Sequence, residues 1–279
     1  MRDLLAQQKE GQLPVDFWIF EDGSTAANAK NNEWLRNEPL VNYTHLAKNN
    51  GRSAIRNTLA RAASASYLLF LDDDSLPVNH HFLKDYCEQL TNGEVICGGR
   101  QYEVSQPSDH YSLHWKYGTT MESKSAETRN ENPYLSFHSN NFLVKKELLL
   151  AMPFDDQLKQ YGHEDTLFGV NLNRNKISIK HIHNPVWHKR LESNKDFLNK
   201  TERALENLRR LQLQEDSFFE EHVNLLMQFN RLTRWQLKGI YSVGFRLFKA
   251  RLQKYLLKSK QPNLLCFNLY KLGCFIELN

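Results

Sequence analysis

Apolar segments of strand length alternate with helically spaced segments over the first 190 residues. Runs that are rich in aromatic and β-branched side chains and are closed by turn residues predict buried strands. We expect strands at 15–20, 41–46, 67–71, 94–99 and 177–182, and helices at 1–12, 52–64, 80–90 and 164–173, with a strand followed by a short helix inside 137–152. Strands that alternate with helices favour an α/β fold with a largely parallel sheet.

Two stretches depart from this alternation. Residues 103–135 are polar and aromatic without a clear period, and a long excursion of this kind in a compact domain is usually functional or mobile. From about 196 to 260 the pattern is helical with little interruption. We therefore expect one α/β domain over 1–195, followed by a basic, mostly helical tail over 196–279.

The composition excludes several classes of protein. With 279 residues, 41% of them apolar and 24% charged, the chain can bury a core and is neither disordered nor collagen-like. It has no run of about 18 apolar residues that would span a bilayer, and its start lacks the apolar region of a secretory signal. The four cysteines lack metal-type spacing, which predicts reduced thiols in a cytoplasmic protein.

The net charge of +4 hides an uneven distribution. Residues 222–276 contain ten Lys and Arg but no Asp or Glu, so a basic tail follows a mildly acidic body. Apolar residues recur at helical spacing within 231–260, and a basic amphipathic helix suits an anionic membrane surface. We expect peripheral binding to the inner face of the cell membrane, although a helix packed on the body fits equally well. A nucleic-acid partner is disfavoured because no known motif accompanies the charge.

Three consecutive carboxylates follow the apolar strand at 67–71. Ligands of open α/β sheets bind at the carboxyl ends of strands, and adjacent carboxylates repel one another unless a cation holds them. Residues i and i+2 of an extended chain point to the same side, so Asp72 and Asp74 would suit Mg²⁺ or Mn²⁺. A solvated acidic turn explains Asp72, Asp73 and Asp74 equally well.

Two further acidic segments stand at turns. Glu21 and Asp22 end the strand at 15–20, where a carboxylate could accept a hydrogen bond from a base or ribose, although turn chemistry alone explains the sequence EDGS. Tyr161-Gly162-His163-Glu164-Asp165 opens a helix. Acidic residues in a first turn complement the helix dipole. Alternatively, one of them is a general base, which requires a carboxylate whose pKa is raised by burial.

Three histidines lie close together in the sequence. His181 and His183 could share one face of the strand at 177–182, as structural histidines often do. His188 stands at a strand end after Pro185-Val186-Trp187, where a neutral imidazole could complete a metal site built on aspartates.

Taken together, these segments resemble the inverting family 2 glycosyltransferases of the GT-A fold. EDGST, NNGRSAIRN and FLDDDSLP are similar to the first half of that family. SNNFLVKKELL, FDDQLKQYGHEDTLFG and NPVWH are similar to its C-terminal half, in the version shared with animal galactosyltransferases. The resemblance covers roughly 13–190, and the order and spacing of the segments make it specific. It implies a Rossmann-like nucleotide-sugar domain that transfers a sugar from a UDP-sugar to an acceptor hydroxyl.

The resemblance also implies roles on the donor side. Asp22 matches the carboxylate that contacts uracil, and Asp72 and Asp74 match the two ends of the DXD motif, with Asp72 toward ribose and metal and Asp74 on the metal. Asp73, between them, belongs to the same donor-binding segment. His188 matches a histidine that can be a third protein ligand to Mn²⁺ or Mg²⁺.

On the acceptor side, the resemblance implies that Asp165 is the catalytic base and that Glu164 orients the acceptor. Arg52 and Arg56, in the helix after Asn50-Gly51, match positions near the diphosphate. A glycan or lipid-linked acceptor, used in surface glycan synthesis, is the expected partner.

One departure from the family pattern concerns the start of the fold. Family members usually begin with an apolar strand that ends in a Pro-Thr-Tyr-Asn-like segment, and here the sequence begins inside the helix that follows it. We therefore expect the first strand of the sheet to be absent, which favours the first of two alternatives to the enzyme; the second rests on the same aspartate cluster. The first is a degenerate nucleotide-sugar-binding protein at a membrane, and the second is a different metal-dependent nucleotidyltransferase.

Overall fold

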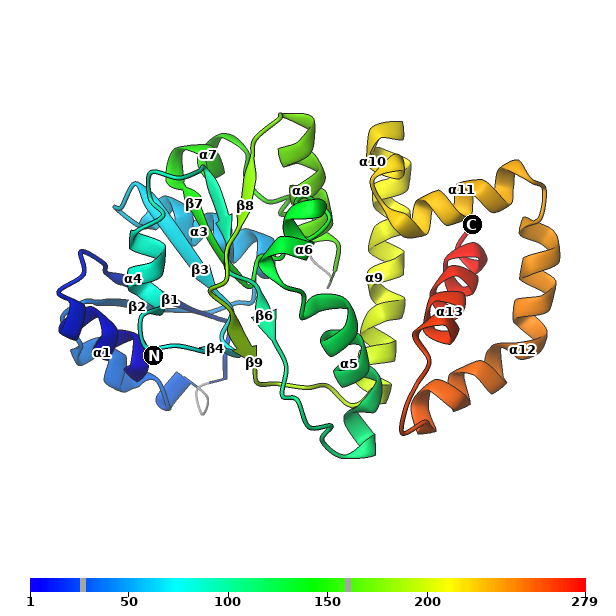
Figure 1. Ribbon diagram of the computed structural model, residues 1–279, viewed down its shortest axis with the longest axis horizontal. Coiled ribbons are helices and arrows are strands. Elements are labelled where there is room, and N and C mark those ends of the chain that lie inside the picture. Colours follow the sequence, from blue (N-terminus) through cyan, green and yellow to red (C-terminus); the bar gives the residue numbers. More distant parts are fainter. Residues whose placement is uncertain (26–28, 159–161) are drawn as a thin grey trace.

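The computed structural model describes residues 1–25, 29–158 and 162–279. Strands and their covering helices form one part of the molecule, and five consecutive helices form the other part, at the opposite end of the long axis (Figure 1). The expected combination of an α/β part with a helical C-terminal region is therefore present.

The sheet that carries the centre of the α/β part is mixed. Its order is β3 (Tyr67–Leu71), β7 (Asn141–Lys145), β5 (Val95–Cys97) and β8 (Ile179–His181). Strand β7 runs antiparallel to both β3 and β5, and only β5 and β8 are parallel. The prediction of a largely parallel sheet is wrong here, because residues 100–140 return the chain to the carboxyl ends of β3 and β5 before β7 begins.

Successive side chains along these strands point alternately into two apolar layers, one on each face of the sheet. Phe142 and Val144 face helices α3 (Arg52–Ala62), α7 (Lys146–Ala151) and α8 (Glu164–Arg174). Leu143, between them, faces the opposite layer, which contains α1 (Arg2–Gly11) and α4 (Phe82–Cys87). Burial on both faces explains why these strands read as continuous apolar runs in the sequence.

Two smaller sheets complete this part of the chain. Strands β1 (Phe17–Asp22) and β2 (Val41–Leu46) are parallel, and a short 3₁₀ helix, η1 (Glu33–Asn37), precedes β2. The third sheet has the order β4 (Ser75–Pro77), β9 (Val186–His188), β6 (Arg100–Gln101). Strands β4 and β6 were not expected, because neither short segment lies in an apolar run like those that contain β5 and β8.

The excursion at 103–135 is built of short helices. They are a 3₁₀ helix, η2 (Asp109–Tyr111), then α5 (Ser112–Tyr117), a π-helical segment, η3 (Gly118–Glu122), and α6 (Ala126–Glu131). Each has six residues or fewer, less than two turns of α-helix, so no hydrophobic period could develop.

The C-terminal region consists of α9 (Asn194–Gln214), α10 (Ser217–Glu221), α11 (Asn224–Arg234), α12 (Lys238–Lys258) and α13 (Leu264–Glu277). Its apolar core is continuous with Leu113 of α5 and Leu167 and Val170 of α8. The helical region is therefore packed onto the α/β part, and the division at residue 195 stays a prediction. Within the described ranges, none of the helices combines the length and the apolarity needed to cross a bilayer.

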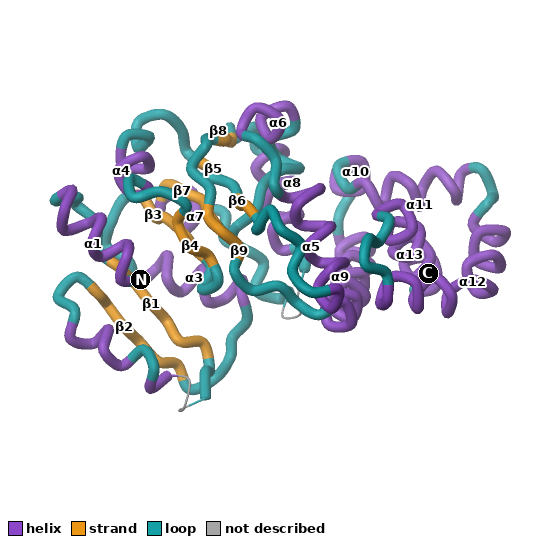
Figure 2. Tube along the Cα trace, turned by 60° about the horizontal axis from the view of Figure 1, so that its bottom comes forward, coloured by secondary structure: helices purple, strands orange, loops and turns teal. Residues whose placement is uncertain are grey.

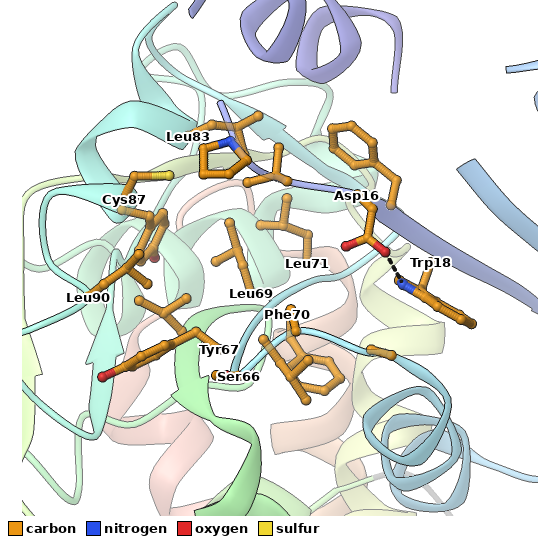
Figure 3. A pocket seen from close by; sticks show the side chains of 18 of the residues that line it. Asp16, Trp18, Ser66, Tyr67, Leu69, Phe70, Leu71, Leu83, Cys87 and Leu90 are labelled. Atoms are coloured by element: carbon orange, nitrogen blue, oxygen red, sulfur yellow. Dashed lines mark hydrogen bonds between the residues drawn. The ribbon is translucent and has the colours of Figure 1, made fainter. Parts of the chain in front are cut away.

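A cavity of about 410 Å³ separates β1 from β3 (Figure 3). Each of these strands is the outermost strand of its own sheet. Apolar side chains from both strands and from α1, α3 and α4 line the cavity, including Phe17, Trp18, Leu69, Leu71 and Leu83. The expected absence of a first strand concerns this region of the fold and stays a prediction.

Candidate active site

The predicted site residues lie where three elements end or begin. Strand β3 ends just before Asp72, and helix α8 begins with Glu164. Because β7 is antiparallel to β3, the first residue of β7 lies beside the last residue of β3. Residues 138–140, which precede β7, therefore lie close to Asp72. The Asp72 amide accordingly donates to the Asn140 carbonyl at 3.2 Å.

A buried arginine joins the two acidic segments. The Arg56 Nη2 donates to Asp72 Oδ1 at 3.0 Å, and its Nη1 lies 4.0 Å from Glu164 Oε1. Arg52, one helical turn earlier and more exposed, places Nη1 3.6 Å from the same Glu164 oxygen. The two predicted arginines therefore lie beside the predicted carboxylates, and their contact with a diphosphate stays a prediction.

Asp74 is paired with His188 through the β4–β9 ladder. Ser75 is opposite His188 in that ladder, and the Lys189 amide donates to the Asp74 carbonyl at 3.0 Å. This register places His188 Nδ1 3.4 Å from Asp74 Oδ1. Burial alone would raise the pKa of Asp74, but the neighbouring His188 ring outweighs it and lowers that pKa.

The remaining aspartate of the triplet faces away from this pair. Asp73 is exposed and lies 3.5 Å from Arg190 Nη1 in an ion pair open to solvent. The triplet is also not extended as expected, because Ser75 donates its amide to the Asp72 carbonyl at 3.0 Å and closes a turn. Asp72 therefore reaches Arg56 while Asp74 reaches His188.

The first turn of α8 presents two carboxylates with different surroundings. Gly162 donates its amide to Glu164 Oε2 at 3.1 Å, and Ser139 donates its amide to Asp165 Oδ2 at 3.1 Å. His138 Nδ1 lies 4.0 Å from that same Asp165 oxygen. Tyr161, the first residue of the predicted motif, lies outside the described residues.

These surroundings push the two pKa values in opposite directions. Burial and the neighbouring charge of Asp165 raise the pKa of Glu164 despite Arg56 and Arg52. For Asp165, burial is outweighed by Arg56, His138 and the hydrogen bonds of Ser139, so its pKa is lowered. The expectation that a base here has a raised pKa therefore holds for Glu164 and is wrong for Asp165, which is ionised at neutral pH.

The backbone before α8 has a conformation that side chains rarely adopt. Gly162 has φ +105° and His163 has φ +69°. A Cβ on Gly162 would lie 2.5 Å from the Cβ of Ala204 in α9. Strained backbone of this kind is concentrated at functional sites, and here it fixes the start of the helix that carries Glu164 and Asp165.

Asp22 holds a loop of the same site. Its Oδ1 accepts the amide and the side-chain Nδ2 of Asn50, both at 2.9 Å, and its Oδ2 accepts the Gly51 amide at 3.1 Å. These bonds tie the end of β1 to the start of α3, which carries Arg52 and Arg56. Contact of Asp22 with uracil stays a prediction.

A buried polar chain in the same region was not predicted from the sequence. Arg100 forms an ion pair with Glu122 at 3.0 Å and donates from Nε and Nη2 to Asn140 Oδ1 at 3.2 and 3.0 Å. Tyr102 donates to the same Glu122 carboxylate. Although burial would raise the pKa of Glu122, Arg100 lowers it to about 2. The one signal available was the place of Arg100 just after the strand predicted at 94–99, since Glu122 lies in a segment without periodicity.

The other two histidines do not join the site. His181 is buried and places Nδ1 2.7 Å from Arg129 Nη1 and Nε2 2.9 Å from the Pro133 carbonyl. His183 is exposed and lies outside β8, so the two histidines do not share a strand face. His188 alone of the three reaches the aspartates.

Several polar atoms around the site are buried without a hydrogen-bond partner among the described residues: Arg56 Nη1, Asp74 Oδ1, Asn140 Nδ2 and Asp165 Oδ1. Buried polar groups are normally satisfied, and exceptions often mark a ligand site. In the described part of the chain no three His, Cys, Asp or Glu side chains converge as a ready-made metal centre. The Asp74 and His188 pair fits a cation that takes its remaining ligands from a substrate phosphate, as Mg²⁺ commonly does.

Comparisons with known proteins bear on the family and the fold of this chain. The family model for glycosyl transferase family 2 matches residues 1–150, and no curated protein matches the chain. The mannosyltransferase PcManGT from Pyrobaculum calidifontis, solved with GDP-Man and Mn²⁺, superposes with a TM-score of 0.57 and 12% identity over 93% of this chain and 76% of that chain. TarS from S. aureus superposes with a TM-score of 0.51 and 15% identity over 92% of this chain and 51% of that chain, so this chain spans about half of that one.

At such identities the structural likeness shows a shared fold. Together with the family match it confirms the expected α/β GT-A fold with a C-terminal helical tail. The finer likeness of 137–188 to animal galactosyltransferases stays a prediction.

Proposed function

The chain belongs to glycosyl transferase family 2, and on that premise we propose that it is a metal-dependent, inverting glycosyltransferase that moves a sugar from a UDP-sugar to an acceptor hydroxyl. The observation that carries this proposal is the meeting of two acidic segments at Arg56. Asp72 contributes from the end of β3 and Glu164 from the start of α8.

Asp165 is the proposed base of the reaction. Its lowered pKa keeps it ionised, and its Oδ1 is without a hydrogen-bond partner among the described residues. The carboxylate takes the proton of the acceptor hydroxyl, whose oxygen forms a bond to the anomeric carbon. The bond from that carbon to the diphosphate oxygen breaks on the opposite face, so UDP leaves and the anomeric configuration inverts. Glu164, held by Arg52, Arg56 and Gly162, orients the acceptor.

Asp74, His188 and Asp72 are the proposed residues around the metal. They would hold Mn²⁺ or Mg²⁺, and the chemistry such an ion would supply is neutralisation of charge on the departing diphosphate. Asp74 and His188 already lie within 3.4 Å of one another. Asp72 also forms an ion pair with Arg56, so the two charges lie together at the end of β3. Asp73 adds a negative charge on the exposed side of the same turn.

We propose that Asp22, Arg52 and Arg56 bind the nucleotide part of the donor. UDP is the nucleotide that the resemblance of the site segments implies. Because a structure of similar fold holds GDP-Man, GDP is the alternative that a binding measurement must separate from UDP.

A glycan or lipid-linked hydroxyl, in surface glycan synthesis, is the proposed acceptor. Glu122, the last residue of η3, pairs with Arg100 beside the site. We propose that η3 and its neighbours α5 and α6 shape the acceptor side. The lack of three converging metal-type side chains among the described residues favours one second candidate, a nucleotide-sugar-binding protein without turnover.

Nucleotide release from sugar donors tests the proposal. We expect the full chain to release UDP from one of a panel of UDP-sugars in the presence of Mn²⁺ or Mg²⁺, and to stop when EDTA is added. Calorimetry with UDP and GDP identifies the nucleotide. Binding without release selects the binding protein, and the absence of both binding and release contradicts the proposal.

A further inference from the structure

Helix α12 has two apolar faces, and only one of them is packed in the molecule. Phe245 and Leu256 are buried against the other C-terminal helices, and Tyr241 OH donates to the Leu269 carbonyl of α13 at 2.9 Å. On the other side Ile240, Val243, Leu247 and Phe248 are 72%, 61%, 72% and 56% exposed. Apolar side chains at this exposure gain little folding free energy, and such a group of them is typical of a binding surface.

The spacing of these residues makes a continuous stripe. At 100° per residue, positions 240, 243, 247 and 248 fall on one side of the helix, and 251, 254, 255 and 258 continue that side toward its end. We call this set the outer face of α12: Ile240, Val243, Leu247, Phe248, Arg251, Lys254, Tyr255 and Lys258. Its first half is apolar and its second half is cationic.

The cations of the outer face are not neutralised by the protein. Within the described residues, no carboxylate lies within ion-pair distance of Arg251, Lys254 or Lys258. The carboxylate of Glu277 is instead taken by Lys249 at 2.6 Å and approached by Arg246 at 3.9 Å, both outside the face. The outer face of α12 therefore suits a partner that is anionic and also offers apolar surface.

The helix is also placed for contact with a large surface. It lies at the end of the molecule opposite β1 and β2, and no other helix of the described chain covers it from outside in either view (Figures 1 and 2). Trp235, half exposed, and Leu237 stand just before its first turn, with the Arg231 guanidinium 4.3 Å from the centre of the Trp235 ring.

We propose that the outer face of α12 binds an anionic lipid bilayer, with its apolar half in the interface and its cationic half at the headgroups. Aliphatic anchors next to unpaired cations are the composition of helices that lie in a membrane interface. A second copy of the chain is disfavoured, because a parallel pair would bring Arg251, Lys254 and Lys258 of both copies together and an antiparallel pair would set them against the apolar half of the partner. This binding does not depend on the transfer reaction.

Vesicle flotation tests the proposal with the full chain and neither donor nor acceptor. We expect flotation with phosphatidylcholine vesicles that contain half phosphatidylglycerol, little with phosphatidylcholine alone, and weakening between 50 and about 500 mM salt. Leu247→Ser with Phe248→Ser should reduce the bound fraction at least tenfold, as should Arg251→Gln with Lys254→Gln and Lys258→Gln. The matched control is Val104→Ser with Leu213→Ser, which removes exposed apolar side chains elsewhere.

The outcomes separate the alternatives. Unchanged melting temperatures of the variants show that loss of binding is not loss of folding. No flotation on anionic vesicles at low salt overturns the proposal, as does equal flotation of the Leu247→Ser/Phe248→Ser variant. A dimer that is detected by light scattering and is lost in that variant assigns the face to a second copy instead. Donor turnover in free solution is measured separately, so failure here leaves the proposed reaction untouched.

Discussion

Adjacent side chains in the first turn of α8 have opposite protonation tendencies. Ser139 and Arg56 stabilise the ionised form of Asp165, whereas burial beside that charge raises the pKa of Glu164. Two carboxylates whose pKa values are pushed apart usually have different tasks. Asp165 is thus available to accept a proton, and Glu164 is better suited to hold a hydroxyl in place.

Replacement of Asp165 by Asn should spare nucleotide binding and remove transfer. Loss of a general base alone costs on the order of 10²–10⁴-fold in rate, and we expect that loss in kcat for sugar transfer. Nucleotide affinity, measured by calorimetry, should change less than about twofold, within the scatter of surface substitutions. A near-normal transfer rate would identify Asp165 as a helix cap, because Asn and Asp cap about equally well.

Asp74→Asn tests the metal at the end of β3. The change keeps the shape of the side chain and removes one charge beside His188. We expect Mn²⁺-dependent nucleotide binding to weaken about tenfold, or about 1.4 kcal/mol. Asp73→Asn is the matched control, since Asp73 is exposed and its ion pair among the described residues is with Arg190 at the surface. Equal effects of the two substitutions would contradict the role of Asp74.

At the scale of elements, the start of α8 depends on one glycine. Gly162→Ala would place a Cβ 2.5 Å from Ala204 at a φ of +105°, and we expect the free energy of unfolding to fall by about 1–3 kcal/mol. Gly244→Ala, in an open position of α12 with no atom within 4 Å of the added Cβ, should raise it by about 0.5–1 kcal/mol. Urea denaturation measures both, and stability changes of the same sign would contradict this account.

The sequence predicts elements well where a strand or helix pattern runs without interruption between turn residues. The strands at 41–46 and 67–71 have the predicted bounds, because each is an uninterrupted strand pattern between turn residues. Strands β4 and β6 and the helices between 109 and 131 are too short to show a period. The direction of β7 depends on how residues 100–140 cross the molecule, which no local pattern reports.

The same limit applies to the candidate site. Its carboxylates were found because they stand at strand ends and at a helix start. The Arg100–Glu122–Tyr102 chain was missed, since its members meet only through the fold. The lowered pKa of Asp165 could not be predicted from the sequence either, because Ser139 and Arg56 approach this carboxylate from distant segments.

At the scale of the whole molecule, buried neutral histidines couple folding to pH. Burial lowers the pKa values of His114, His163 and His181 to about 4. In the unfolded chain the ordinary value is about 6.5. The stability that they contribute is therefore present in full above pH 6.5 and is lost as the pH falls toward 4.

We expect the melting temperature to be nearly constant between pH 7 and 8 and to fall by several degrees between pH 6.5 and 4.5. For a chain of this size, about 1 kcal/mol shifts the melting temperature by roughly 2–4 °C. Thermal unfolding followed by circular dichroism at constant ionic strength measures the change. A melting temperature that stays constant or rises toward pH 4.5 would show that these histidines are not buried in neutral form.

The cavity between β1 and β3 bears on how the protein behaves in concentrated solution. Both strands stand at an edge of their sheet, and the side chains around the cavity are mostly apolar. Unprotected strand edges of this kind pair readily with other chains and lead to aggregation. Refolding yield should therefore fall with protein concentration, and amide hydrogens of β1 and β3 that face the cavity should exchange with solvent faster than those of β5 and β7.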